Sequence, residues 1–188
     1  MSATSSRKPR ADALRNREHI LAVAREAFAK DGAKVTLDDI VRLSGLGVGT
    51  LYRNFSTRDA LLEALYRSEL EKLAVAEREL SESLPPVEAL RQWLLIFVEM
   101  VATKIALKEA LNAMVCGTDE LYAASGDLMQ KSITALTDRA VAGGEIVLNV
   151  EPLDLLRALT GIANASPGPN WHENARRMVD VLIAGMRI

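Results

Sequence analysis

The sequence predicts an all-α protein, and three observations support this fold class. Aromatic residues make up only 4% of the 188 residues, while Leu and Ala are abundant, a composition that favours helices over sheets. Between Gly and Pro breaks, apolar residues recur at the three- and four-residue spacing of a helical face. The segment "EIVLNV" (145–150) is β-like, but we interpret it as an extended loop because it has no second strand to pair with.

The N-terminal segment is expected to be a disordered basic arm followed by a helix. Residues 1–10 are polar, and Pro9 lies among them. From about 11 to 30 the apolar residues follow a helical stripe, and Gly32 is a suitable terminator for that helix.

Two short helices are predicted next. In "TLDD", Thr36 is placed to cap the second helix and Asp39 to bond back to the cap. A third helix is predicted from about 48 to 54, which is too short to be stable alone. We therefore expect Leu51 and Phe55, four residues apart, to be held by packing against the neighbouring helices.

The rest of the chain also has the pattern of helices. A long helix is predicted from 57 to about 83, with Ser56 and Asp59 as its capping pair and the prolines at 85–86 ending it. Five more helices are predicted, about nine in all: 87–102, 105–115, 119–142, 152–163 and 171–186.

The first three helices fit a helix-turn-helix. Gly45 allows a tight turn between the second and the third, and in this motif the third helix enters the major groove of DNA. The predicted domains are a disordered arm (1–10), a helix-turn-helix DNA-binding domain (11–56) and a larger helical domain (57–188).

The start of the third helix is suited to reading bases. Gly47 and Gly49 leave little side-chain bulk there, so the helix N-terminus can approach DNA closely. Gly47, Val48 and Thr50 would face base edges, where Val48 and the Thr50 methyl group can touch thymine methyls.

Polar residues around this helix would hold the DNA backbone. Tyr52 and Asn54 carry neutral donors for phosphate oxygens, and Arg53 can either pair with guanine or bind phosphate. Thr36 and Arg58 stand at the starts of helices, which also suits phosphate contacts.

The charge distribution is asymmetric. Residues 1–58 hold 11 Lys+Arg and 6 Asp+Glu, a balance of +5, whereas residues 59–188 hold 12 and 19, a balance of −7. A basic end on an acidic body indicates a polyanion partner for that end. A solvated basic tail is the alternative, since three of the cations lie in 7–10.

These residues together resemble a known family. The segment "TLDDIVRLSGLGVGTLYRNFSTRDALLEAL" (36–65) is similar to the DNA-binding signature of TetR-type transcriptional regulators, with "GTLYRNF" and "STRDAL" as its most specific part. The similarity covers roughly residues 12–66. Further on, "FVEMVATKIALKEAL" and "DELYAASGDLM" resemble the SbtR-like subgroup. The resemblance places DNA contacts at Thr36, Leu37, Gly47, Val48, Thr50, Tyr52, Arg53, Asn54 and Arg58.

The chain departs from this family pattern at three positions. Relatives often carry polar residues where this chain has Gly47 and Val48, so base preference would depend more on Thr50, Arg53 and the N-terminal arm. Asn54 stands where His is frequent, which changes a phosphate contact but not the fold.

The last two predicted helices carry broad apolar stripes. TetR-type proteins dimerise by pairing two such helices with those of a second copy, and a two-fold dimer would bind a palindromic operator. The alternative is that the stripes only close the core of one chain. The residues assigned to the homodimer interface are Leu156, Leu159, Trp171, Ala175, Met178, Val179, Leu182 and Met186.

The resemblance also implies a pocket for an unknown small-molecule effector in the second half. Met suits adaptable pockets, although Met and aromatic stripes also occur in plain cores. An effector that prefers a dimer with mismatched recognition helices would lower DNA affinity, so a repressor released by its effector is expected. The pocket candidates are Trp93, Phe97, Met100, Met114, Leu121, Met129 and Ile133.

Other classes of protein have less support. The sequence has no acid/base cluster, zinc spacing or phosphate-binding glycine loop, so we expect neither an enzyme nor a metal or cofactor. A helical carrier or interaction module that has lost DNA binding is the remaining alternative, and the basic end and "TLYRNF" argue against it.

The chain carries one cysteine and no membrane signal. Cys116 excludes an internal disulfide, and it is either a small buried hydrophobe or a redox-sensing thiol. No apolar run approaches the length of a membrane span, and residues 1–10 lack a secretory signal, so we expect a cytoplasmic protein.

Overall fold

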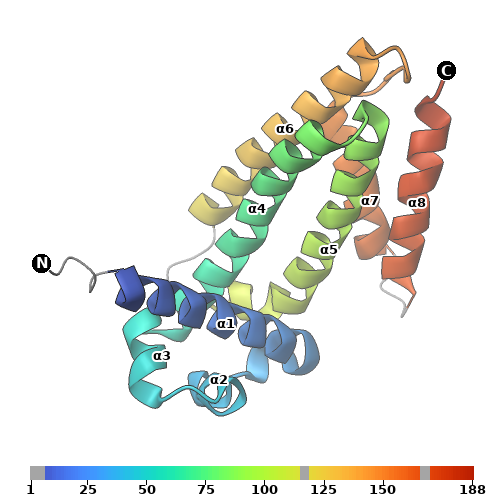
Figure 1. Cartoon of the computed structure of the whole chain (residues 1–188). Helices are drawn as coiled ribbons and strands as arrows, with labels where there is room; N and C mark the ends of the chain where they lie inside the picture. Colours follow the sequence, from blue (N-terminus) through green and yellow to red (C-terminus); the bar gives the residue numbers. More distant parts are fainter. Residues whose placement is uncertain (1–6, 115–118, 166–169) are drawn as a thin grey trace, which may run out of the picture. The chain divides into compact units, whose positions relative to one another are not determined.

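The computed structural model describes residues 7–114, 119–165 and 170–188. Over these residues the chain forms eight α-helices, one short 3-10 helix (η1) and no strand (Figure 1). This confirms the all-α class, and "EIVLNV" contributes a single bridge between Ile146 and Arg187. The elements are α1 (Arg7–Asp31), η1 (Gly32–Lys34), α2 (Leu37–Ser44), α3 (Val48–Asn54), α4 (Arg58–Ser83), α5 (Pro86–Asn112), α6 (Asp119–Ala142), α7 (Pro152–Ala165) and α8 (Trp171–Met186).

The described residues contain one helix fewer than the nine or so expected. The segments 87–102 and 105–115 were predicted as separate helices, but α5 runs through both as far as Asn112. The stretch between them has no glycine or proline that would end a helix. The Thr103 hydroxyl donates to the Glu99 carbonyl oxygen at 3.2 Å, a bond that a helix interior accommodates. The helix therefore continues.

Two helix starts also differ from the prediction. α1 begins at Arg7 rather than near 11, so it includes the end of the segment predicted to be a disordered arm. At the start of α4, the Thr57 hydroxyl accepts a hydrogen bond from the Ala60 backbone N–H at 3.1 Å. Thr57 therefore caps α4, one residue after the predicted cap Ser56.

The chain divides into two compact units. The first comprises residues 1–66 and 106–118, and it contains α1, η1, α2 and α3. The second comprises residues 67–105 and 119–188, and it contains α6, α7 and α8. Each of the long helices α4 and α5 contributes one part to either unit.

The first unit has its core where the helix-turn-helix packs together. Ile20 and Phe28 form part of a buried stripe on α1, and Ile40 of α2 is fully buried as well. Leu51 and Phe55 are 0% and 1% exposed, as the spacing predicted. Packing of this inner face therefore holds α3, which is only seven residues long.

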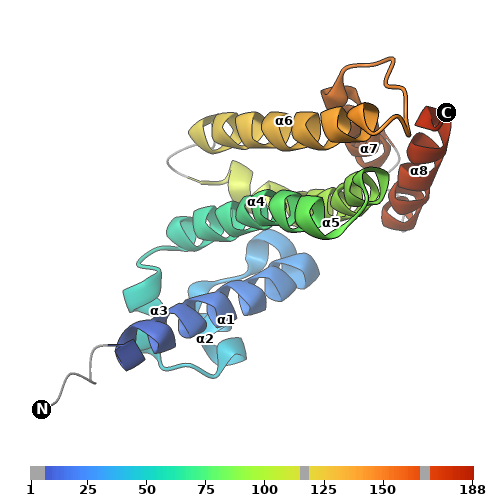
Figure 2. The same cartoon turned by 45° about the horizontal axis from the view of Figure 1, so that its top comes forward.

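The second unit is built on one apolar core shared by the end of α4 and by α5, α6, α7 and α8 (Figure 2). Trp93 is fully buried in this core, and its ring stacks on Phe97 with 6.1 Å between centroids. Its Nε1–H donates to the Leu73 carbonyl oxygen at 2.9 Å, which satisfies the polar group of the indole and ties α5 to α4. At the surface, Arg91 Nε donates to Asp180 Oδ1 at 2.7 Å and links α5 to α8.

Candidate nucleic-acid interface

The start of α2 is held by Thr36 and Asp39. The Thr36 hydroxyl accepts from the Asp39 backbone N–H at 3.2 Å and donates to Asp39 Oδ2 at 2.7 Å, and the Thr36 N–H donates to the same oxygen at 3.1 Å. This confirms the predicted capping box. The hydrogen bonds from Thr36, followed by that from Arg42, lower the pKa of Asp39 to about 2. Thr36 therefore stabilises the helix start in addition to any contact with DNA.

The turn between α2 and α3 is tied to α1. Gly45 ends α2 with a φ of 67°, in the left-handed region that glycine favours. His19 Nε2 on α1 lies 3.0 Å from the Ser44 carbonyl oxygen, within hydrogen-bonding distance. Carbonyl groups at a helix end lack a partner within the helix, so His19 supplies one. Spacing along α1 could not indicate this role, because the partner lies on another helix.

The recognition candidate α3 has a buried face and an exposed face. Leu51 is fully buried, whereas Val48 and Tyr52 are 57% and 42% exposed. Gly49 and Arg53 are exposed as well and lie beside them on the helix. These four residues, Val48, Gly49, Tyr52 and Arg53, form what we call the α3 outer face.

The polar side chains of α3 bond within the helix. Asn54 Nδ2 donates to the Thr50 carbonyl oxygen at 2.8 Å, which serves a carbonyl near the helix end. Arg53 Nη2 donates to Thr50 Oγ1 at 3.3 Å, a long bond at an exposed position. At the end of α3, the Arg17 guanidinium of α1 lies 4.5 Å from the centroid of the Phe55 ring, a contact that the sequence did not indicate.

Arg58 bonds to the protein's own backbone. Its Nε donates to the Val35 carbonyl oxygen at 2.9 Å, and its Nη2 donates to the Ala33 carbonyl oxygen at 2.8 Å. The guanidinium also lies 5.4 Å from the centroid of the Phe28 ring. Arg58 was predicted as a phosphate contact, and this geometry makes it a tie between the start of α4 and the turn that precedes α2.

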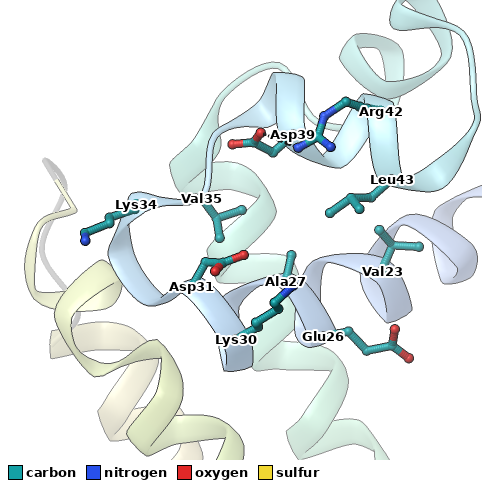
Figure 3. Close-up of a pocket in the computed structure, with 10 residues that line it drawn as sticks. All are labelled: Val23, Glu26, Ala27, Lys30, Asp31, Lys34, Val35, Asp39, Arg42 and Leu43. Atoms are coloured by element: carbon teal, nitrogen blue, oxygen red, sulfur yellow. Dashed lines mark hydrogen bonds and ion pairs between the residues drawn. The ribbon is translucent and has the colours of Figure 1, made fainter.

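A hollow of about 490 Å³ opens between α1, η1 and α2 in the first unit (Figure 3). On its α2 side, Arg42 Nη2 donates to Asp39 Oδ1 at 3.0 Å. Acidic and basic side chains are equally represented in it, so the hollow offers no cationic patch to a polyanion. Its lining residues are Val23, Glu26, Ala27, Lys30, Asp31, Lys34, Val35, Asp39, Arg42 and Leu43.

The second unit contains a cleft of its own, also of about 490 Å³, among α5, α6 and α7. Two of the seven residues predicted for an effector pocket, Phe97 and Met129, line this cleft. The spacing of residues along α7 did not suggest that this helix would supply much of the wall. The lining residues are Phe97, Gly126, Asp127, Met129, Gln130, Leu153, Leu156, Arg157, Thr160, Gly161 and Asn164.

Four of the other five residues predicted for the pocket lie elsewhere. Trp93, Met100 and Ile133 are buried in the core of the second unit. Met114 is half-buried and belongs to the first unit. The Leu121 side chain lies outside the described residues, as does Cys116.

The residues predicted for a dimer interface divide between core and surface. Val181, which the prediction omitted, is 60% exposed on α8 although it is apolar. Four of the predicted residues are buried within the chain: Leu156, Leu159, Ala175 and Val179. The other four, Trp171, Met178, Leu182 and Met186, are partly buried and pack against the core of the second unit. On the solvent-exposed side of α8, Val181 is the one large apolar side chain.

The part of the chain that the structure describes contains no group of three His, Cys, Asp or Glu side chains that could hold a metal ion. No helix in it is long and apolar enough to cross a membrane. His172 instead joins an ionic group, since its Nε2 lies 3.0 Å from Glu99 Oε2 and Arg176 Nη1 donates to Glu99 Oε1 at 2.7 Å.

The chain is similar to known regulators in both of its parts. Residues 20–65 match the family described as bacterial regulatory proteins, tetR family, and residues 85–188 match transcriptional regulator SbtR-like, C-terminal domain. Among solved structures, the TetR transcriptional regulator SCO0520 from Streptomyces coelicolor is 41% identical, with a TM-score of 0.81 over 91% of this chain and 98% of that one. A TetR transcription regulatory protein from Mycobacterium vanbaalenii is 28% identical, with a TM-score of 0.77 over 95% and 99%.

Two curated relatives match over shorter stretches. The probable HTH-type transcriptional regulator ArpR of Pseudomonas putida is 33% identical over 121 residues, which are 61% of this chain and 58% of that protein. The HTH-type transcriptional regulator SAR0097 of Staphylococcus aureus is 32% identical over 73 residues, 38% of either chain. This chain thus spans less than two thirds of the length of these curated relatives.

Proposed function

Because this chain belongs to the TetR family of DNA-binding transcriptional regulators, we propose that it acts in the cytoplasm as a homodimeric repressor. It binds a palindromic operator and is released by a small-molecule effector. The observation that carries the proposal is the α3 outer face. Val48 and Tyr52 are exposed one turn apart, while Leu51 is buried behind them. A helix held from behind in this way fits the major groove with its outer side chains free.

The glycines beside Val48 support close approach to DNA. A Cβ atom added at Gly47 or Gly49 would meet no atom within 4 Å, and neither residue has a left-handed φ. Neither packing within the chain nor backbone geometry therefore requires glycine at these positions. A surface without side chains at the start of α3 suits a duplex that lies against it.

The other DNA contacts divide by role. Val48 and Thr50 read base edges, and Tyr52 and Arg53 bind phosphate or guanine. Leu37, Gly47, Asn54 and Thr36 complete the set of proposed contacts, and Arg58, the remaining candidate from the sequence, holds the turn before α2 instead. Arg53 can give up its long hydrogen bond to Thr50 and bind a phosphate instead. The cost is small because the bond lies at an exposed site.

The roles of Val48 and Tyr52 are tested with operator duplexes that each carry one altered base pair. Val48→Ala should change the preference at one position of each half-site by about 1 kcal/mol, because a methyl contact to a base is lost. Tyr52→Phe should weaken binding to all duplexes alike, because a phosphate contact carries no sequence information. Fluorescence anisotropy measures both. The assignment fails if Tyr52→Phe alters preference at one base pair or if Val48→Ala leaves every preference unchanged.

The proposed dimer forms through the outer faces of α7 and α8. Val181 is the one large apolar residue exposed on α8, and Ala158 and Gly161 on α7 are small and exposed. Small residues allow helices of two copies to approach closely, and burial of Val181 supplies apolar contact area. In a two-fold dimer the two copies of α3 are related by the dimer axis. They therefore bind two half-sites that are related by the same symmetry, which is a palindromic operator.

The effector is proposed to bind in the cleft among α5, α6 and α7. Its volume of about 490 Å³ lies within the usual range of small-molecule sites, roughly 300–1,000 Å³. An effector that releases DNA lowers the protein's affinity for DNA by a certain factor. Thermodynamic linkage then requires that bound DNA lowers the protein's affinity for the effector by the same factor. Titrating the effector into free and DNA-bound protein measures this factor, and equal affinity for the two states would contradict release by the effector.

A further inference from the structure

The cleft of the second unit has apolar residues on each of its three helices. Phe97 of α5 and Leu156 of α7 are buried, while Met129 of α6 and Leu153 of α7 are half-buried. A ligand whose hydrocarbon part covers these side chains removes apolar surface from water, which favours binding. The polar residues of the cleft then decide which head group such a ligand carries.

The charged residues that line the cleft are Asp127 on α6 and Arg157 on α7. The charge of Arg157 is balanced within the chain, because its Nη1 donates to Asp154 Oδ1 at 2.8 Å. The cleft and this ion pair together therefore keep one net charge, the negative charge of Asp127.

The carboxylate of Asp127 is exposed, and in the described part of the second unit no cation pairs with it. Lys131 stands one helical turn further along α6, at the spacing of a helical ion pair, but the two side chains form none. The side chains outside the described part of this unit belong to residues 119–121, 124 and 166–169, and none of these is Lys, Arg or His. Asp127 is thus available to a cation from outside the chain.

The second unit as a whole also favours a cationic ligand. Residues 67–105 and 119–188 hold 11 Lys+Arg and 16 Asp+Glu, a balance of −5. The negative potential of such a unit raises the local concentration of cations and lowers that of anions. The charge of the unit and the charge of its cleft therefore select the same class of molecule.

We propose that the cleft takes an amphipathic cation, whose apolar body packs against Phe97, Met129 and Leu153 and whose ammonium group pairs with Asp127. This assignment rests on the proposed function of the cleft as the effector site. An exposed ion pair contributes little by itself, so the apolar body supplies most of the affinity and Asp127 selects the head group. A carboxylate or phosphate in the same place would meet Asp127 with like charge.

The test compares probes that share one apolar body and differ in the head group. Phenylbutylamine, phenylbutanol and phenylbutyrate, and the corresponding naphthylbutyl series, are titrated calorimetrically into the full-length protein. The amine should bind about threefold more tightly than the alcohol, which corresponds to one exposed ion pair. The acid should bind about threefold more weakly than the alcohol, because its charge has the opposite sign.

Three variants test whether Asp127 is the residue that selects the head group. Asp127→Asn keeps the size of the side chain and should bind the three probes of a series about equally, with the alcohol affinity unchanged. Asp127→Lys should reverse the order, so that the acid binds best. Asp138→Asn is the matched control, because Asp138 is exposed on the same helix and does not line the cleft. It should keep the wild-type preference for the amine.

The methionine methyl groups report where the apolar body binds. Met129 lines the cleft, whereas Met100 is buried in the core and does not line it. In methyl-labelled protein, the phenyl or naphthyl ring should shift the Met129 resonance, with the dissociation constant found by calorimetry. The Met100 resonance should move less.

The outcomes distinguish the inference from the proposed function. The inference is overturned if no amine binds, if amine and alcohol bind equally, if the Met129 resonance does not move, or if Asp138→Asn removes the preference as fully as Asp127→Asn. If amines bind through Asp127 but do not release operator DNA, the cation site stands and the proposed release mechanism fails. If an anionic or uncharged compound releases DNA from the cleft and no amine is preferred, the release mechanism stands and the cation assignment fails.

Discussion

The bonds of Arg58 lead to a quantitative prediction about the helix-turn-helix. In Arg58→Met the side chain keeps its length but loses the hydrogen bonds to the Val35 and Ala33 carbonyl oxygens, at 2.9 and 2.8 Å, and the contact with the Phe28 ring. Each bond from a charged donor contributes about 1 kcal/mol at this partly exposed site, and the ring contact about 0.5 kcal/mol. The expected loss for the first unit is therefore about 2–3 kcal/mol.

Hydrogen exchange followed by mass spectrometry measures this loss locally. Opening of η1 and α2 should become roughly 30- to 150-fold more frequent in Arg58→Met, the factor that corresponds to about 2–3 kcal/mol. Peptides from α7, in the second unit, serve as the internal reference. Arg53→Met is the matched control, because Arg53 is exposed and makes one long bond of 3.3 Å to Thr50. Its exchange rates should stay near those of the wild type, while its DNA affinity falls.

The reasoning about Arg58 is refuted by unchanged exchange in α2. It is also refuted if both variants accelerate exchange equally. A phosphate contact has a different signature, since its loss lowers the slope of log affinity against log salt by about one. If Arg58→Met lowers that slope and leaves exchange unchanged, Arg58 is a DNA contact and not a structural tie.

Three further predictions concern the cap, the turn and the dimer. Asp39 has a pKa of about 2 in the folded chain against 3.8 as its ordinary value, so its stabilising effect is complete above that value and is lost as pH falls towards 2. The difference in urea midpoint between wild type and Asp39→Asn should therefore shrink over this range, and a constant difference would exclude the capping role. Gly45→Ala should cost about 1–2 kcal/mol in urea denaturation because its φ is 67°, whereas Gly49→Ala should not destabilise the chain, and equal losses would contradict the argument. Val181→Glu should convert a dimer to a monomer in light scattering, while Val147→Glu, at a loop position of similar exposure, should not; a dimeric Val181→Glu would exclude the α8 interface.

The sequence predicted elements best where a local signal marks both ends. The bounds of α3, α6 and α8 agree with the predicted ranges 48–54, 119–142 and 171–186. Loop residues such as Gly and Pro flank these helices, and apolar spacing within them is regular. The division of α5 was wrong because the stretch around Thr103 carries no such signal.

The candidate site was predictable in part, and the limit is physical. The capping box of Thr36 and the burial of Leu51 follow from spacings of three or four residues within one element. The contact of His19 with Ser44 and the bonds of Arg58 join residues more than 20 positions apart. Such contacts depend on how the helices pack against one another, and the periodicity of the sequence does not contain that information.

The residues of the last two helices show the same limit. An apolar stripe on a helix predicts that one face of the helix is buried. It does not show whether the same chain or a second copy buries that face. Leu159 and Val179 are covered within the chain, while Val181 was not selected because it stands apart from the stripe's regular spacing. Exposure in the folded chain was needed to separate the two sets.

The central claim is that a two-fold dimer presents α3 to DNA, and one measurement tests it most directly. The purified protein is used to select duplexes from a random library at two salt concentrations, and the bound fragments are sequenced. The account predicts an enriched palindrome whose half-sites lie about one helical turn apart, with weaker overall binding at the higher salt. Enrichment of a single unrepeated site would contradict the dimer, and absence of enrichment at both salt concentrations would contradict sequence-specific recognition by α3.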